Sequence, residues 1–157
     1  IQSQISELYP TLAPVIDDIL PKKKLSVAKC QEHVQITLVD SAPMFFNQRD
    51  GPFLPHLRFL HKYPKFMKYM KADKGAVPFI LSGANIMAPG FTSAGGDIPQ
   101  ELEVGEPVAI FAEGKESPLA VGIMKMSTED MRKTNKGIAV ENCHFLTDGL
   151  WVTSRID

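Results

Sequence analysis

The sequence predicts an α+β fold in two parts: a small N-terminal α+β domain (residues 1–68) and a strand-rich domain (residues 69–157). Apolar residues recur at helical spacing over the first twenty positions. The C-terminal half instead alternates short strand signals with turn residues, as small barrels do. At 44% hydrophobic and 22% charged, the chain resembles an ordinary folded protein that can bury a core.

The first helical segment is amphipathic but contains two prolines. Its apolar stripe comprises Ile1, Ile5, Leu8, Leu12, Val15, Ile16, Ile19 and Leu20. Pro10 and Pro14 each remove a hydrogen-bond donor and clash with the preceding turn. We therefore expect two short helices, or one helix broken near Tyr9, ending at Pro21.

Strands and one further helix complete the first domain. Residues 33–39 alternate as a strand, a second strand follows from Met44, and residues 55–63 read as a helix. We expect inward-facing side chains at Val34, Ile36, Leu38, Leu57, Leu60 and Tyr63.

The second domain has several short strands and two capped helices. Strands are expected at residues 108–112, 119–126 and 138–142. Asp73 can cap a helix over residues 74–82, and Ser127 opens a capping box for a helix over residues 128–135. Asp148-Gly149 reads as the turn of a hairpin, and Trp151 as a plug of the barrel. The pattern predicts a five- or six-stranded, closed or nearly closed barrel.

A loop of small residues follows the first of these helices. Gly83, Ala84 and Gly90 carry little or no side chain, so backbone N–H groups could approach a phosphate or a base edge closely. The alternative is that these residues serve only a tight turn, and the pattern alone favours it because glycine turns are common.

Lysines recur at every third position across the domain junction, interleaved with aromatic residues. The run comprises Lys62, Tyr63, Lys65, Phe66, Lys68, Tyr69, Lys71 and Lys74. Cations for phosphates and rings for bases are what single-stranded RNA binding requires. A solvated linker whose aromatic residues belong to the core explains the run equally well.

Other features exclude several functional classes. The net charge of −1 gives no global nucleic-acid signature, so RNA binding would need a local patch. The two cysteines favour buried thiols in a reducing compartment, and we expect a cytoplasmic protein. Zinc-ligand spacing, nucleophile motifs and a membrane-spanning apolar run are missing from the sequence, which predicts no enzyme activity, metal, cofactor or membrane contact. Because the chain starts at Ile1 and not Met, we expect native residues to precede it.

Several segments resemble a known RNA-binding domain. Lys74-Gly75-Ala76, the stretch from Leu81 to Met87, and Pro89-Gly90 resemble the opening motif of a PUA domain, the fold named for pseudouridine synthases and archaeosine transglycosylases. Residues 107–112, 120–122 and 136–141 resemble its later strands in the same order. The resemblance implies a PUA-type β pseudo-barrel after the small N-terminal domain.

The resemblance extends over nearly the whole chain. His61-Lys62-Tyr63-Pro64, Phe45-Phe46 with Gly51-Pro52-Phe53, Pro21-Lys22-Lys23, Met124-Lys125-Met126-Ser127 and Asp148-Gly149-Leu150-Trp151 together resemble the malignant T-cell amplified sequence family. Ala88 and Pro78 depart from it, since a cysteine and a lysine are expected there. Pro78 slightly weakens any phosphate contact at that point.

The family implies a non-enzymatic RNA-binding translation factor that acts in initiation, reinitiation or recycling of the small ribosomal subunit. It also implies a protein partner resembling density-regulated protein. The alternative is an accessory RNA-binding subunit of an RNA-modification enzyme. About 65 residues before the barrel are too few for a pseudouridine synthase domain of ordinary size.

The resemblance also implies a ligand-facing segment. It consists of Ser82, Gly83, Ala84, Asn85, Met87, Pro89 and Gly90, and we expect Lys125 and Lys136 on neighbouring elements to contact phosphates of tRNA or small-subunit ribosomal RNA. Val34, Ile36, Leu38, Phe45 and Phe46 are expected to leave apolar surface free for the protein partner.

Overall fold

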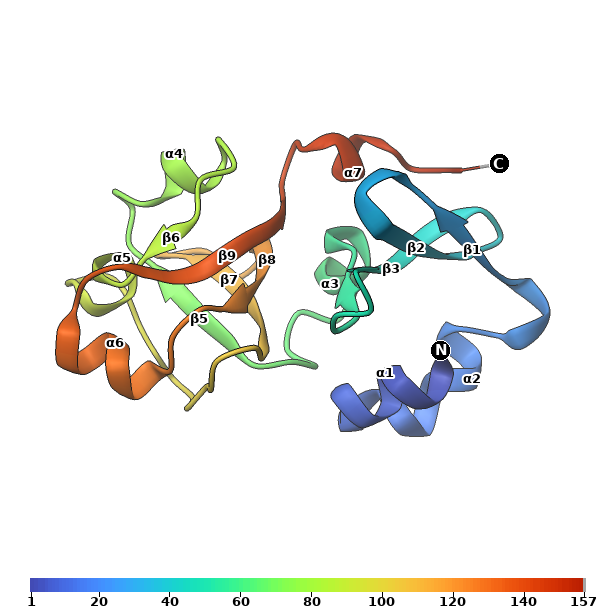
Figure 1. The fold of residues 1–157 in the computed structure, drawn as a ribbon, viewed down its shortest axis with the longest axis horizontal. Coiled ribbons are helices and arrows are strands. Elements are labelled where there is room, and N and C mark those ends of the chain that lie inside the picture. Colours follow the sequence, from blue (N-terminus) through green and yellow to red (C-terminus); the bar gives the residue numbers. More distant parts are fainter. Residues whose placement is uncertain (157) are drawn as a thin grey trace.

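The computed structural model describes residues 1–156 and contains two sheets with short helices around them (Figure 1). The N-terminal sheet is antiparallel, in the order β1-β2-β3-β4, with strands Leu25–Lys29, Val34–Val39, Ala42–Gln48 and Leu54–Pro55. Its helical elements are α1 (Gln2–Leu8), η1 (Pro10–Val15), α2 (Ile16–Ile19), η2 (Lys22–Lys24), η3 (Gln31–His33) and α3 (Leu57–Lys62).

The expected break near Tyr9 is confirmed. Tyr9 takes a non-helical conformation at the end of α1, and Pro10 begins η1. Tyr9 is buried and its hydroxyl donates to the Phe53 carbonyl at 2.5 Å, which ties the break to the sheet. A proline at the first helical position lacks a donor that would be unsatisfied anyway, so Pro10 is well tolerated there.

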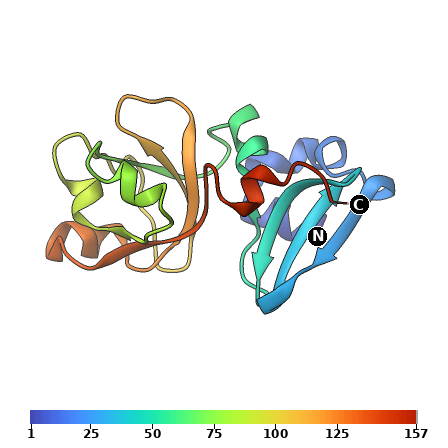
Figure 2. The same cartoon turned by 90° about the horizontal axis from the view of Figure 1, so that it is seen from above.

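The C-terminal sheet has five strands, which agrees with the five or six that the sequence predicts, and their order is β5-β7-β8-β9-β6. Figure 2 shows this sheet from above. Its strands are β5 (Tyr69–Ala72), β6 (Ile86–Met87), β7 (Pro107–Ala112), β8 (Pro118–Met124) and β9 (Ile138–Phe145). Helices α4 (Val77–Ile80), α5 (Pro89–Thr92) and α6 (Thr128–Thr134) lie around this sheet, whereas α7 (Gly149–Val152) follows β9 and lies beside the N-terminal domain. Strands β5 and β7 pair in parallel, the other described pairs of this sheet are antiparallel, and the sheet curls into a pseudo-barrel.

Two apolar clusters hold the molecule together. One lies inside the barrel and includes Met70, Phe91 and Met131. The other joins Phe45 and the N-terminal helices to barrel residues that include Phe111 and Val121. The N-terminal core therefore continues onto the outer face of the barrel.

This continuity overturns one expectation about the N-terminal sheet. Ile36, Leu38, Phe45 and Phe46 are at most 8% exposed, and Val34 is half-buried, so these residues do not form a free apolar surface. The Phe46 ring lies 5.6 Å from the His144 ring of β9, so the barrel side covers part of this face. The first domain is too small to bury these residues alone, and the second domain completes the burial.

Three local expectations were wrong. Tyr63 is 52% exposed, and Phe59 occupies the inward position instead. Asp148-Gly149 starts α7 rather than a hairpin, since the Asp148 side chain accepts from the Trp151 N–H. Trp151 therefore lies against the N-terminal domain and does not plug the barrel.

Candidate RNA-binding surface

The segment predicted to face RNA begins with a helix of only four residues, α4. Asp73 positions it by accepting from the Ala76 N–H at 2.9 Å. Consecutive helical residues point about 100° apart, so three successive apolar side chains cannot all face one core. Ile80 is buried, whereas Phe79 is 66% and Leu81 is 38% exposed.

The loop after α4 is a helix cap and not an open cradle of N–H groups. Gly83 has φ +92°, its N–H donates to the Ile80 carbonyl, and the Ala84 N–H donates to the Phe79 carbonyl. This is the Schellman arrangement, which satisfies the last carbonyls of a helix. The Ser82 N–H also donates to the Phe79 carbonyl. The expectation that these N–H groups are free for a ligand was therefore wrong. Ser82 and Ala84 are nevertheless exposed to solvent, and Gly83 is half-buried.

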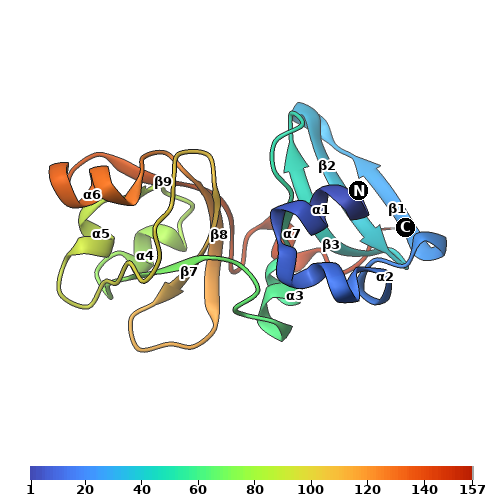
Figure 3. The ribbon, with the colours of Figure 1, turned by 90° about the horizontal axis from the view of Figure 1, so that it is seen from below.

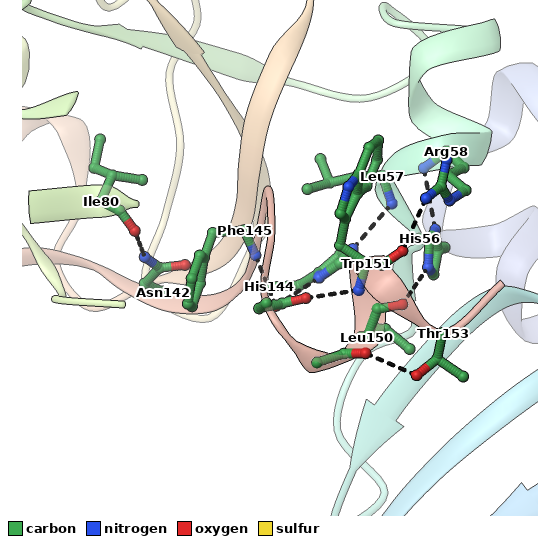
Figure 4. A network of polar contacts seen from close by, with 12 residues as sticks. His56, Leu57, Arg58, Ile80, Asn142, His144, Phe145, Leu150, Trp151 and Thr153 are labelled. Atoms are coloured by element: carbon green, nitrogen blue, oxygen red, sulfur yellow. Dashed lines mark hydrogen bonds and ion pairs between the residues drawn. The ribbon is translucent and has the colours of Figure 1, made fainter. Parts of the chain in front are cut away.

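Asn142 of β9 fixes this loop to the sheet. Its side-chain amide donates to the carbonyls of Ile80 and Ala84, each at 3.1 Å (Figure 4). The backbone N–H of Asn142 in turn donates to Oδ1 of Asn85 at 3.1 Å. Asn85 was expected to offer both a donor and an acceptor, but its acceptor oxygen already has this partner.

The edge strand β6 presents the next predicted residue. Met87 is 48% exposed and pairs in register with Ile138, which is 43% exposed. Pro89 is exposed at the start of α5. Gly90 serves packing, because its carbonyl accepts from the Asp73 N–H and a Cβ there would lie 3.4 Å from Ala76 Cβ.

The two predicted lysines differ in their surroundings. Lys136 is exposed, and the Ala88 N–H donates to the carbonyl of Gly137, the next residue, which brings Lys136 close to the start of α5 at the end of β6. Lys125 forms an ion pair with Glu141 at 2.9 Å, and Glu141 lines a cavity between the two domains. The hydrogen bond that Lys125 donates to Glu141 raises the pKa of Lys125. The structure thus brings Lys136 to the edge formed by β6, whereas Lys125 follows β8 beside the start of β9 with its charge already paired.

Sequence reasoning missed Phe79, Ile138 and Asn142. Phe79 carried a usable signal, because it stands between two apolar neighbours in a helix of one turn. Ile138 and Asn142 carried none, since their roles depend on which strand lies next to them.

The interleaved lysines and aromatic residues of the junction do not form one stripe. Phe66 packs edge-on against Tyr9 at 5.1 Å, and Tyr69 packs against Phe111 at 5.1 Å. Lys68 pairs with Glu106 at 3.3 Å. Phe66 and Tyr69 therefore pack against other aromatic rings and Lys68 is paired, whereas Tyr63 alone among the three aromatic residues of the run is largely exposed.

A second polar cluster, His56, His144 and Asp148, lies at the domain junction (Figure 4). His144 is fully buried; its Nε2 accepts from the Leu57 N–H at 3.1 Å, so its Nδ1–H donates to Asp148 at 2.8 Å. In His56, Nδ1 accepts from the Arg58 N–H, so Nε2–H donates to the Leu150 carbonyl. Both nitrogens of each ring therefore have partners within the protein, which matches the expectation of a structural His144.

Burial and hydrogen bonding shift the pKa values of His56 and Asp148. Desolvation lowers the pKa of His56 to about 4, although the bond to the Leu150 carbonyl opposes the shift. Burial alone would raise the pKa of Asp148, but hydrogen bonds from His144, Phe145 and Trp151 outweigh it and lower that pKa. These groups join the domains and lack a proton or lone pair aimed at solvent for acid–base chemistry.

Neither the thiols nor the acidic residues of the range 1–156 form a metal-binding group. Cys30 is exposed rather than buried, and burial raises the pKa of the half-buried Cys143 to about 12. Within that range, no group of three or more His, Cys, Asp or Glu residues is arranged to hold a metal ion. None of the described helices has the length and apolar character needed to cross a membrane.

Comparisons with known proteins agree with this architecture. A family model described as a Pre-PUA-like domain matches residues 1–64, and one described as a PUA domain matches residues 68–146. A hypothetical protein of the archaeon Pyrococcus horikoshii has the same fold, with a TM-score of 0.74 and 30% identity over 98% of this chain and 96% of its own. A conserved PUA domain protein of Thermoplasma acidophilum gives a TM-score of 0.68 at 22% identity, covering 98% of this chain and 96% of that protein.

Curated relatives are closer in sequence. Malignant T-cell-amplified sequence 1 of Rattus norvegicus is 50% identical over 96% of this chain and 83% of the relative. Translation machinery-associated protein 20 of Schizosaccharomyces pombe is 44% identical over 98% of this chain and 85% of the relative. Because a relative of this name is 50% identical over 96% of this chain, and the Pre-PUA-like and PUA models together match most of it, the chain belongs to the malignant T-cell-amplified sequence family.

Proposed function

We propose that this chain is a non-enzymatic, RNA-binding translation factor whose PUA domain contacts tRNA or small-subunit ribosomal RNA. An RNA-binding role related to translation follows from the PUA domain and the named relatives. We further propose that the chain acts on the small ribosomal subunit in the cytoplasm, during initiation, reinitiation or recycling. A partner resembling density-regulated protein would act with it, with residues 1–68 serving the partner and residues 69–157 the RNA.

The observation that supports the RNA site is the exposed apolar and cationic edge along α4, β6 and the start of β9. Phe79 and Met87 are 66% and 48% exposed, and Lys136 extends from the segment paired with β6. An exposed ring can stack on a base of any identity, and a lysine can contact a phosphate without strict geometry. The proposed RNA-facing residues are therefore Phe79, Ser82, Gly83, Ala84, Asn85, Met87, Pro89, Gly90 and Lys136, with a minor role for Lys125.

Gly83 itself cannot provide a clean test of this site. It adopts φ +92°, and a Cβ at this position would lie 3.2 Å from the Phe145 ring. Any side chain there would strain the helix cap, so loss of binding could reflect loss of structure.

Phe79→Ala provides a cleaner test, because the ring contributes little to the core. Base stacking on an aromatic ring contributes about 1–3 kcal/mol, so we expect binding of tRNA and of purified small ribosomal subunits to weaken about fivefold or more. Val104→Ala is the matched control, since Val104 is 63% exposed in the segment before β7. Equal affinities of the two folded variants would remove Phe79 from the site.

Enzyme activity is tested separately on the parent chain. Purified protein is incubated with tRNA, and the digested nucleosides are analysed by mass spectrometry. We expect unchanged nucleosides, whereas accumulation of a modified nucleoside with time would contradict a non-enzymatic role.

A further inference from the structure

A groove on the N-terminal domain lies between two elements that are distant in sequence. Its lining residues come mainly from the η1–α2 segment on one side and from α3 with the residues after it on the other. Figure 3 shows where these segments lie on the N-terminal domain. The groove encloses about 530 Å³. Its floor contains Leu12 and Phe59, each 4% exposed, so the base of the groove is apolar and fixed.

Two large apolar side chains stand exposed on the walls of this groove. Val15 is 43% exposed on η1, and Tyr63 is 52% exposed at the end of α3. Tyr63 leans against Phe59, with ring centroids 5.4 Å apart at 55°. Isolated exposed apolar residues need no explanation, but two facing across an apolar hollow resemble an anchor site for a partner's side chain.

The rim of the groove carries charges of opposite sign on its two sides. Lys62 and Lys65 lie on the α3 side, and Asp18 lies on the α2 side. The Lys65 ammonium also lies 5.5 Å from the centroid of the Tyr69 ring. No ion pair is formed by Lys62, Lys65 or Asp18 with any residue in the described range 1–156. A segment that fits this groove would direct acidic residues toward the two lysines.

We propose that the groove docks an amphipathic segment of a protein partner, with large apolar side chains in the hollow and acidic residues facing Lys62 and Lys65. The proposal rests on the proposed function in one respect, the presence of a protein partner, and assigns that partner a surface and a chemistry. A helix laid in an apolar groove is a recurring mode of peptide recognition.

A protein segment fits this groove better than RNA does. Asp18 would repel a phosphate backbone that followed the two lysines. The floor lies below the rim and is apolar, which suits an aliphatic or aromatic side chain more than a flat base with polar edges. Binding of RNA in this groove would overturn the proposal.

Fluorescence anisotropy with defined probes tests the groove on the full chain. The probes are a synthetic helical peptide with leucines on one face flanked by glutamates, the same peptide with lysines in place of glutamates, and labelled oligouridine. We expect the glutamate peptide to bind, with a dissociation constant on the order of 10 μM for so small a surface.

Val15→Asp is the principal variant. Val15 is the N-cap residue of α2, and aspartate is favoured at this position, so the variant should fold. We expect at least a tenfold loss of glutamate-peptide affinity. Val27→Asp is the matched control, because Val27 is 41% exposed on the edge strand β1, and it should leave binding unchanged.

A charge swap tests the rim. Lys62→Glu with Lys65→Glu should reverse the preference of the chain, so that it binds the lysine peptide better than the glutamate peptide. Failure of both peptides to bind the parent, equal effects of Val15→Asp and Val27→Asp, or lysine-dependent binding of oligouridine at the groove would each overturn the proposal.

Binding of tRNA is measured in parallel on the same proteins. Retention of tRNA binding by a chain that fails to bind the peptides would refute the docking groove and leave the RNA function standing. Absence of tRNA binding in the parent would refute the RNA function, whatever the peptides do.

Discussion

The two ends of β9 differ in whether their side chains have partners within the protein. At its start, Ile138 is exposed and the adjacent Lys136 has no ion pair with any residue in the range 1–156. At its end, His144 is fully buried and both of its ring nitrogens have partners. The start of β9 is therefore exposed to solvent, whereas its end belongs to the buried hydrogen-bonded cluster that joins the two domains.

The two ends of β9 are therefore expected to serve different purposes, binding at its start and stability at its end. Groups that have no internal partner keep their capacity to bind something else, whereas groups that are mutually satisfied hold the domains together. Substitutions at the end of β9 should therefore change folding, and substitutions at its start should change binding.

The largest expected effect is that of Asp148→Ala. Its carboxylate accepts from the His144 ring and from the backbone N–H groups of Phe145 and Trp151. The alanine would leave His144 Nδ1–H buried without a partner and remove the cap of α7. We expect a loss of about 3 kcal/mol in the free energy of unfolding, measured by urea denaturation. Asp148→Asn keeps an acceptor and should lose less free energy of unfolding. Equal stability of Asp148→Ala and the parent would show that the His144–Asp148 hydrogen bonds do not stabilise the domain junction.

A smaller effect should appear in the pH dependence of stability. The pKa of His56 is lowered from 6.5 to about 4 on folding, so between these values the unfolded chain binds a proton that the folded chain does not. Stability should therefore fall by roughly 2–3 kcal/mol as the pH drops from about 6.5 to 4. Comparing urea midpoints of the parent and of His56→Gln across this range isolates the contribution, since the Gln variant should show a flatter profile.

Lys136→Ala should weaken RNA binding without changing stability. Loss of one phosphate contact lowers the slope of log affinity against log salt by about one unit. Lys23→Ala, which removes the same charge from the N-terminal domain, is the control. A salt slope identical to that of the parent would exclude Lys136 from the RNA contact.

Lys125→Ala should have the smallest effect on RNA binding. Lys125 is already paired with Glu141 at 2.9 Å, so a carboxylate offsets its charge before any RNA binds. We expect less than a twofold change in tRNA affinity at about 0.15 M salt, because the net charge of the pair is near zero and its remaining field is screened. A loss equal to that of Lys136→Ala would show that Lys125 contacts the RNA as closely as Lys136 does.

The sequence alone determined the features that depend on local rules. Ser127 caps α6 by accepting from the Asp130 N–H, and Pro10 breaks the first helix, as their neighbours in sequence predict. Asp148 shows the limit of such rules, because aspartate before glycine is favoured both in a hairpin turn and at a helix N-cap. Only the packing of Trp151 against His56 and Arg58 decided between them.

Tertiary structure decided which groups remain free. The sequence determined that Gly83 and Ala84 are small, but the capping bonds to Ile80 and Phe79 decided that their N–H groups are occupied. The sequence also determined that residues such as Phe46 are apolar, but the position of the barrel decided that β9 covers them. The reason is that propensity and capping act over a few neighbouring residues, whereas burial and hydrogen-bond satisfaction depend on partners distant in sequence.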